Sequence, residues 1–432
     1  MDAENVNRLR GDERAREVIK SLSALAFAHH AIACYKQTMR HPSTQREHIQ
    51  RLFIGRSFRI QTCLMLAISC LLGLLPATAL ETEQTRFRQA VSGYQFQFPD
   101  DHGSHDAFRT EWWYYTGHLA AEDGREFGYE LTFFRQAVDD PDVNNNPSRW
   151  AIRHLYLAHA ALSERDTPRF RYAEKISRAG IGKAGSETGR LHVWIDRWTA
   201  EAVPVADHQA HHLRAAAGDF SFDLFLDPDK APVVHGEGGI SRKGTEPGQA
   251  SHYYSLTRLR TTGTLTVEGH VQTVHGLSWM DHEFGSGRLG KDQVGWDWFS
   301  IQLDNQSEFM FYLLRRADGT ADPVSSGTWV LSDGTTSTLS LPDVHIDVLD
   351  HWTSPVSGTR YPSGWRLSIP SRRLSLLLVP KMQNQELITE RSTQVTYWEG
   401  AVKVTGQVGE RPITGQGYVE LTGYAKPFET SR

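Results

Sequence analysis

The feature that most constrains the fold of this chain is a period-two alternation of apolar and polar residues that begins near residue 90. It recurs in short segments such as "YQFQF", "EWWYYTGHL", "FSFDLFL" and "GTLTVEGHV", which are rich in aromatic and β-branched residues. Such alternation is typical of β-strands. The pairs Asp123-Gly124, Asp318-Gly319 and Asp333-Gly334 fall between segments of this kind and indicate hairpin turns. The sequence therefore predicts a nearly all-β protein.

Two stretches of the chain echo each other. Residues 112–135, "WWYYTGHLAAEDGREFGYELTFFR", and residues 296–315, "WDWFSIQLDNQSEFMFYLLR", each begin with aromatic residues, pass through a polar turn and end in arginine. One hairpin used twice predicts two antiparallel β-barrel domains in tandem, over residues 90–280 and 281–425. A two-sheet sandwich would show the same pattern. Residues 165–210, rich in Arg, Lys, Gly and Ala, are expected to form a long decorated loop.

The N-terminal residues have a different character. In "RSFRIQTCLMLAISCLLGLLPATALE" two arginines precede an apolar run of roughly 15 residues, which is short for a membrane span, and the run ends in small residues. We predict a signal peptide over residues 56–80, cleaved near Ala79, and hence a secreted, periplasmic protein. A retained membrane anchor and lipidation at Cys70 are the alternatives. Residues 1–55 are expected to be a disordered leader or to reflect a start codon assigned too early, with Met39 as the other start.

Composition narrows the classes of function. The three cysteines precede the predicted cleavage, so the mature protein is expected to have no disulfide, thiolate metal site or cysteine nucleophile. The formal net charge is −5 and no run of lysines and arginines marks a nucleic-acid footprint. The small net charge leaves a small or apolar ligand as the expected partner, and the 39% of hydrophobic and 10% of aromatic residues support more than one buried core.

The stretch "HGLSWMDHEFGSG", residues 275–287, concentrates the residue types of an active site. On a regular strand Trp279, Asp281 and Glu283 share one face and His282 points to the other, so Asp281, His282 and Glu283 cannot all converge on one ion. No metal and no cofactor are predicted; a hydrogen-bonded network, ligand contact or acid-base catalysis remain open. "GSGRLG", residues 285–290, matches a dinucleotide-binding string, but a strand and not a helix is expected after it, so its glycines are assigned to a bend.

In two predicted tryptophan-rich strands the sequence does not decide which face points inward. In "WDW" the tryptophans Trp296 and Trp298 share one face and Asp297 lies on the other, either solvated or buried as a general acid. In "EWWYY" Trp113 and Tyr115 share a face opposite Trp112. These aromatic residues, with Trp279, are the predicted ligand-binding residues, and Asp281, His282 and Asp297 are the predicted catalytic ones. His208, His211 and His212 are expected to be a solvated cluster, and the serine-hydrolase elbow G-x-S-x-G is absent.

The motifs "FRTEWWYYTGHL", "GYELTFFR", "WMDHEFGSG" and "GWDWFSIQLD", in this order, resemble the AttH group of proteins, which is related to the carotenoid 1,2-hydratases (CrtC, hydroxyneurosporene synthases). The resemblance covers about residues 95–425 and implies two lipocalin-like β-barrel domains. It implies for the hydratase branch a strong acid that protonates an alkene, placed here among Asp281, His282 and Asp297, with Trp279, Trp296 and Trp298 as cation-stabilising walls.

Two functions follow as expectations. The first is a secreted lipocalin-like protein that binds an apolar or lipid-like ligand and serves an ABC-type envelope export system, with permease components as partners. The second is a secreted hydratase or hydrolase that adds water to an apolar substrate. The residues leave open whether the protein is an enzyme.

Overall fold

The computed structural model describes residues 87–138, 146–148, 150–246, 248–287 and 289–427. The predicted leader, the signal peptide and the three cysteines lie outside these residues. None of the helices in the described part is long and apolar enough to cross a membrane. The helices found there are three-residue 3-10 turns, η1 (Asp100–His102), η2 (Leu341–Asp343) and η3 (Pro370–Arg372).

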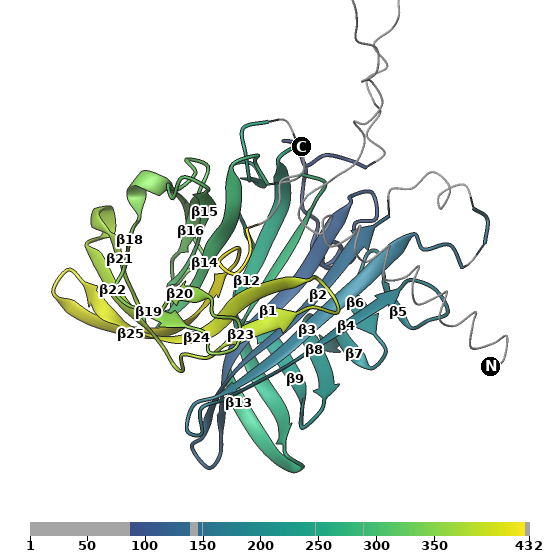
Figure 1. Ribbon diagram of the computed structural model, residues 1–432, viewed down its shortest axis with the longest axis horizontal. Coiled ribbons are helices and arrows are strands. Elements are labelled where there is room, and N and C mark those ends of the chain that lie inside the picture. The colour runs from purple at the N-terminus through teal and green to yellow at the C-terminus, as the bar shows by residue number, and fades with distance from the viewer. Residues whose placement is uncertain (1–86, 139–145, 149, 247, 288, 428–432) are drawn as a thin grey trace, which may run out of the picture. The chain divides into compact units, whose positions relative to one another are not determined.

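The first sheet contains thirteen strands and curls into a nearly closed barrel (Figure 1, purple to teal). Eleven strands follow the order β4-β3-β2-β1-β13-β12-β9-β8-β7-β6-β5, and β10 and β11 pair with β12. Near the seam, β3 and β4 approach β6. The bounds are β1 (Thr110–Ala121), β2 (Glu126–Ala137), β3 (His154–Glu164), β4 (Arg169–Arg178), β5 (Ala184–Ser186), β6 (His192–Ile195), β7 (Trp198–Val205), β8 (His208–Ala217), β9 (Phe220–Pro228), β10 (Val233–Val234), β11 (Ile240–Arg242), β12 (Ala250–Val267) and β13 (His270–Gly285).

The second sheet contains ten strands (Figure 1, green to yellow), in the order β17-β16-β15-β14-β25-β24-β22-β21-β18, with β23 paired to β24. A separate two-stranded sheet joins β19 to β20. The bounds are β14 (Gln293–Leu303), β15 (Glu308–Arg316), β16 (Ser326–Val330), β17 (Thr336–Ser340), β18 (His345–Val348), β19 (His351–Thr353), β20 (Arg360–Pro362), β21 (Trp365–Ile369), β22 (Leu374–Pro380), β23 (Glu386–Thr389), β24 (Val395–Val408) and β25 (Arg411–Leu421).

The two sheets repeat one strand order, and the all-β prediction is confirmed. In each sheet the first four strands along the chain pair in sequence order, and the first of them also pairs with the last strand of that sheet. Thus β1 pairs with β13, and β14 pairs with β25. The echoed stretches are the β1–β2 and β14–β15 hairpins, which occupy equivalent places. The three Asp-Gly pairs lie in turns. Each sheet encloses its own apolar core.

The prediction of a long loop over residues 165–210 is wrong, because β4 to β7 and the start of β8 occupy it. These strands close the barrel and are partly solvated: β4 has no buried side chain. Glycines with positive φ, among them Gly180 and Gly189, make the turns between them. β4 lacks the apolar alternation that marks central strands, whereas β6 alternates, with Val193 and Ile195 buried.

Strand β13 runs through the predicted boundary between residues 280 and 281 and stays in the first sheet as far as Gly285. It forms a long hairpin with β12 whose turn residues, Glu268 and Gly269, both have positive φ. The glycine-rich segment after Gly285 joins β13 to β14, so it connects one strand to another as predicted. The motif-bearing end of β13 therefore lies at the point where the chain passes to the second sheet.

Candidate functional site

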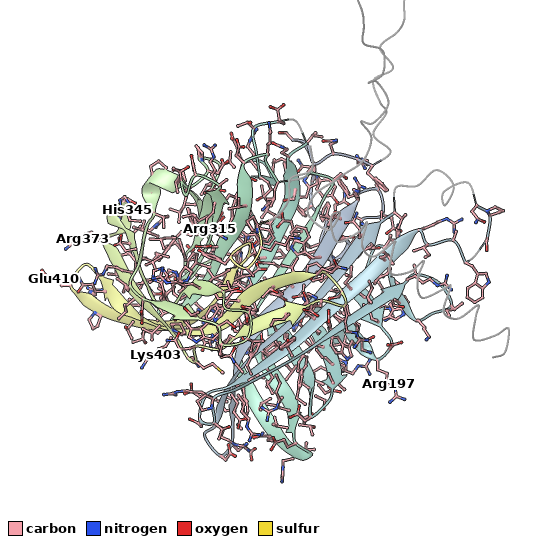
Figure 2. All side chains as sticks on the ribbon, in the orientation of Figure 1. Arg197, Arg315, His345, Arg373, Lys403 and Glu410 are labelled. Carbon is pink, nitrogen blue, oxygen red and sulfur yellow. The ribbon has the colours of Figure 1, made fainter. Side chains whose placement is uncertain are left out.

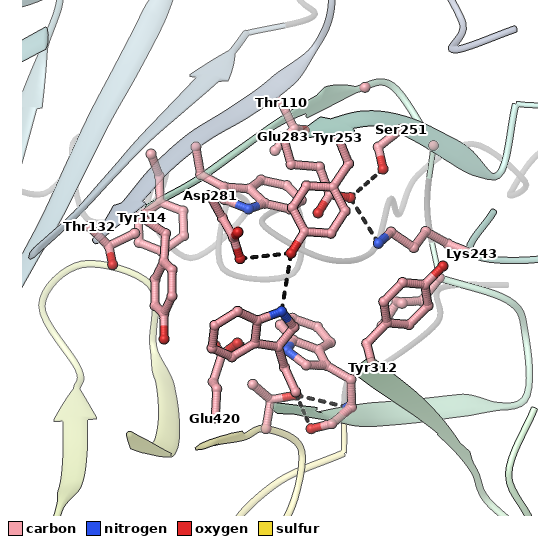
Figure 3. Close-up of a pocket in the computed structure, with 18 of the residues that line it drawn as sticks. Thr110, Tyr114, Thr132, Lys243, Ser251, Tyr253, Asp281, Glu283, Tyr312 and Glu420 are labelled. Carbon is pink, nitrogen blue, oxygen red and sulfur yellow. Dashed lines mark hydrogen bonds and ion pairs between the residues drawn. The ribbon is translucent and has the colours of Figure 1, made fainter. Parts of the chain in front are cut away.

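A cavity of about 180 Å³ lies between the two sheets, bounded by strands of both (Figure 3). Much of its wall is aromatic and includes Trp112, Tyr114, Phe134, Trp296, Trp298, Tyr312 and Tyr397. A cluster of buried apolar residues contributed by both sheets surrounds it. The cavity therefore offers an apolar ligand a largely aromatic binding surface.

Strand alternation decides which motif residues face this cavity. On β13, Asp281 and Glu283 line it with Trp279 packed on the same side, whereas Met280 and His282 lie on the barrel side. β12 contributes Ser251 and Tyr253 to the cavity by the same alternation. The second sheet supplies the facing wall.

Asp281 stands at the centre of the polar groups in the cavity. Tyr253 donates a hydrogen bond to its Oδ2 at 2.7 Å, Trp279 Nε1 donates to Oδ1 at 2.6 Å, and the Ser255 hydroxyl also donates to Oδ1. Burial raises the pKa of Asp281 to about 7, because desolvation outweighs the hydrogen bonds that favour the carboxylate. A carboxyl group that holds its proton near neutrality and faces an aromatic cavity can act as a general acid.

Tyr253 links the acid to the opposite sheet. Its hydroxyl accepts a hydrogen bond from Trp298 Nε1 at 3.1 Å while it donates to Asp281. Burial, followed by the neighbouring carboxylates of Asp281 and Glu283, raises the pKa of Tyr253 well above its ordinary value. The phenol therefore stays neutral and orients the acid.

Lys243 brings a positive charge to one end of the cavity. Its Nζ lies 3.0 Å from Glu283 Oε1 and 4.2 Å from the ring centroid of Tyr312. The Ser251 hydroxyl also donates to Glu283. The pair balances its own charge, so this end is polar but neutral overall.

Three glutamates gather at another part of the wall. Glu130 and Glu420 line the cavity, and Glu399 lies behind Tyr114, whose hydroxyl donates to Glu399 Oε1 at 2.6 Å. Burial raises the pKa of Glu130 to about 7 and that of Glu420 to about 8, and it raises the pKa of Glu399 well above the usual range. Near neutral pH this end therefore holds carboxylic acids.

The structure separates the predicted catalytic residues. His282 lies behind Asp281 inside the barrel, stacked on Trp113, with Nε2 2.8 Å from Glu111 Oε1. Asp297 lies on the face of β14 away from Trp298, where Arg315 Nε donates to it at 2.8 Å and Tyr424 donates at 3.0 Å. Asp297 is thus neither solvated nor in the cavity.

The predicted ligand-binding residues divide in the same way. Trp112, Trp296 and Trp298 line the cavity, whereas Trp113 and Tyr115 belong to the barrel core. Trp279 packs beside the cavity and contacts Asp281.

The histidine group of β8 also divides by face. His208 and His212 pair with Asp227 and Asp223 on the outer side. His211 is instead buried in the barrel, with Nδ1 3.0 Å from the Tyr115 hydroxyl. The expectation of one solvated cluster is wrong for His211, because alternation along β8 turns it inward.

A second polar network fills the end of the barrel. His105, Glu111 and His282 offer donor atoms within 4.8 Å of one another, the group among the described residues closest to a metal-binding set. Glu111 already accepts from Arg135 Nε at 3.0 Å and from His105. Burial opposes the charges, but these partners hold the pKa of Glu111 well below its usual value and the carboxylates raise that of His105 to about 9. The charged groups of this network therefore balance one another through ion pairs.

Sequence reasoning missed Tyr253, Lys243, Glu130 and Glu420, which come from four separate segments. Glu130 carries the clearest signal, since a carboxylate interrupts the apolar run "GYELTFF".

The model of the AttH-like family matches residues 89–424. A crystal structure of a candidate AttH protein from Nitrosomonas europaea is 33% identical, covers 78% of this chain and 100% of that chain, and superimposes with a TM-score of 0.70. Kievitone hydratase from Nectria haematococca shares the fold at 16% identity, with a TM-score of 0.59 over 79% of this chain and 98% of that one.

A sequence relative, "Dehydratase asqC" of Emericella nidulans, is 23% identical over 56% of this chain. The match covers 66% of that protein, so the chain spans just under two thirds of its length. The family match and the similarity to the Nitrosomonas protein extend over most of the described residues. The chain therefore belongs to the AttH-like family.

Proposed function

We propose that the chain is a hydro-lyase that adds water to, or removes water from, an apolar substrate held between the two sheets. The single observation that carries the proposal is Asp281, a buried carboxyl group that faces the aromatic cavity and keeps its proton to about pH 7. The name of the relative "Dehydratase asqC" supports the same class of reaction.

In the hydration direction, the Asp281 O–H transfers its proton to one alkene carbon, and the π electrons form the new C–H bond. The positive charge left on the other carbon lies among the rings of Trp112 and Trp298, whose faces stabilise cations. Water then forms the C–O bond, and its surplus proton returns to the Asp281 carboxylate. Dehydration is the reverse sequence, with Asp281 protonating the leaving hydroxyl group.

The test is a screen of apolar alkenes and their hydrates by mass spectrometry, followed for gain or loss of one water in ordinary and deuterated water. Asp281→Asn is expected to lower turnover by at least about 100-fold, since amide nitrogen cannot supply the proton. Asp347→Asn, on the exposed part of β18, is the matched control and should retain activity. Wild-type rates in Asp281→Asn would contradict the proposal.

A second function uses the same cavity without turnover: binding of an apolar or lipid-like ligand for an ABC-type envelope export system. The aromatic lining of the cavity favours ligand binding of this kind. Organic extraction of the purified protein should release a hydrophobic molecule, and pull-down from envelope extracts should recover permease components. Repeated extraction of nothing, together with an empty pull-down, would argue against it.

A further inference from the structure

The glutamate end of the cavity contains more acceptor atoms than the protein supplies with donors. Glu130 Oε1 accepts from Thr132 at 2.7 Å and from Tyr397 at 3.2 Å, and Glu420 Oε2 accepts from Trp296 Nε1 at 2.8 Å. Glu130 Oε2 and Glu399 Oε2 are buried and accept no hydrogen bond from any described residue. Glu130 is 1% exposed and lines the cavity. Its Oε2 atom has no hydrogen-bond partner among the described residues, and a buried polar atom at the edge of a cavity calls for a partner from a ligand.

No cation of the described residues balances these three glutamates, since none of the ion pairs found there includes them. His159, which also lines the cavity, and the nearby His118 are buried, and burial lowers the pKa of each to about 3. Both rings are therefore neutral. Lys243 is engaged by Glu283, and Figure 3 shows it on the other side of Asp281 from Tyr114 and Thr132.

The walls of this end also favour positive charge. Trp296, Tyr114 and Tyr397 each hold one of the three glutamates by a hydrogen bond and supply aromatic surface there. Aromatic faces attract cations, most strongly when desolvated. Among the described residues, the three glutamates do not form a group compact enough to hold a metal ion, whereas His105, Glu111 and His282 do. The spread of the acids suits an organic cation with several N–H donors.

We propose that the Glu130 and Glu420 end of the cavity binds the ammonium group of an amphipathic amine, whose apolar part lies along the tryptophans toward Asp281. Lys243 is paired with Glu283, so the other end has no net negative charge to attract the ammonium, and the glutamate end sets the orientation of the ligand. This inference rests on the proposed function for the use of the cavity, but binding is independent of turnover.

Binding is measured with 2-phenylethylammonium and, as a neutral match, 2-phenylethanol, through tryptophan fluorescence and calorimetry at about pH 6.5. The ammonium should bind at least about tenfold more tightly than the alcohol. Because the glutamates are protonated in the free protein at this pH, the ammonium should displace protons, seen as a buffer-dependent binding enthalpy. The alcohol should displace none. Equal affinities, or ammonium binding without proton release, would overturn the inference.

Glu130→Gln and Glu420→Gln should each weaken ammonium binding by about tenfold and so reduce the preference for the ammonium over the alcohol. Glu410→Gln, at the exposed tip of the β24–β25 hairpin in Figure 2, is the matched control and should change neither. Unfolding curves identify any variant that loses its fold, and proton release by the wild type tests the inference without variants. Asp281→Asn separates the two proposals: it should lose turnover and keep the preference for the amine.

Discussion

At the scale of single residues, the chemistry of this protein depends on how burial changes the charge of carboxyl groups. Asp281, Glu130 and Glu420 face one cavity, and burial raises the pKa of each toward or above neutrality. Glu111 is buried equally deeply, yet Arg135 and His105 keep it ionised. Among the residues that the structure describes, no cation pairs with the three cavity carboxyl groups, so they stay neutral, whereas Glu111 has cationic neighbours and stays ionised.

The raised pKa of Asp281 makes the stability of the fold depend on pH in a definite direction. The folded state holds the Asp281 proton from the ordinary carboxyl range up to about pH 7, where the unfolded chain has released it. Asp281 therefore lowers the free energy of unfolding as pH rises through this window, and the loss is complete above about pH 7.

Asp281→Asn should remove this dependence, so the variant is expected to melt at a higher temperature than the wild type at about pH 9 and to differ less at about pH 4. Melting temperatures measured across this range check the prediction. A variant that is less stable than the wild type at every pH would show that Asp281 is a structural carboxylate, with no energetic penalty for its charge.

At the scale of elements, the site depends on the close pairing of β1 with β13. Leu119 of β1 lies opposite Gly276 of β13, where a Cβ atom added to Gly276 would stand 1.8 Å from the carbonyl oxygen of His118. The backbone of β1 cannot move away from this Cβ atom without breaking the hydrogen bonds between β1 and β13. The glycine in "HGLSWM" is thus required by the approach of the neighbouring strand.

Gly276→Ala should lower the free energy of unfolding by about 2–4 kcal/mol, because the methyl group forces the strands apart. Urea unfolding measures the change. Gly290→Ala is the matched control, since the added Cβ would meet only the end of the Gln293 side chain, at 3.2 Å, and should cost less than about 0.5 kcal/mol. Equal effects of the two substitutions would contradict this account of β13.

At the scale of the whole molecule, buried ion pairs join the two sheets. Arg258 Nε of β12 lies 2.6 Å from Glu308 Oε1 of β15, and Lys230 Nζ lies 2.7 Å from Glu308 Oε2. Glu308 is fully buried. Since the sheets also share the aromatic cluster around the cavity, we expect them to unfold in one transition.

Glu308→Gln should lower the free energy of unfolding by about 3–5 kcal/mol, because it leaves two cations near the interface without a counter-charge. Glu268→Gln removes a half-exposed partner of Arg169 and Arg171 and should cost less than about 1 kcal/mol. Scanning calorimetry of both variants checks the prediction. Two separated transitions in the wild type would show that the sheets are independent.

The signal peptide predicted over residues 56–80 lies outside the described residues and can be tested by experiment. When the full sequence is expressed in a bacterium, N-terminal sequencing should find processing after Ala79 and the protein in the periplasm. Ala79→Asp should block cleavage and leave the precursor. A mature N-terminus at lipid-modified Cys70 would show lipidation instead, and an unprocessed membrane-bound chain would show a retained anchor.

The sequence by itself determined the class of fold and the pairing of faces. Alternation predicted that Trp279, Asp281 and Glu283 share one face of a strand and that His282 faces the other way, and both hold in the structure. The two similar hairpin sequences predicted two related β units. This was possible because the alternation that forms a strand is a local pattern, readable without knowing which strands pair.

Only the tertiary structure decided which face of each strand meets the cavity. Residues 278–285 of β13 are buried on both faces, one by the barrel core and one by the second sheet, so apolar character could not separate Asp281 from His282. Tyr253, Lys243, Glu130 and Glu420 joined the site through pairings between distant strands, which no local pattern records. The charge states followed from the same cause, since desolvation depends on what a strand is packed against and not on its own residues.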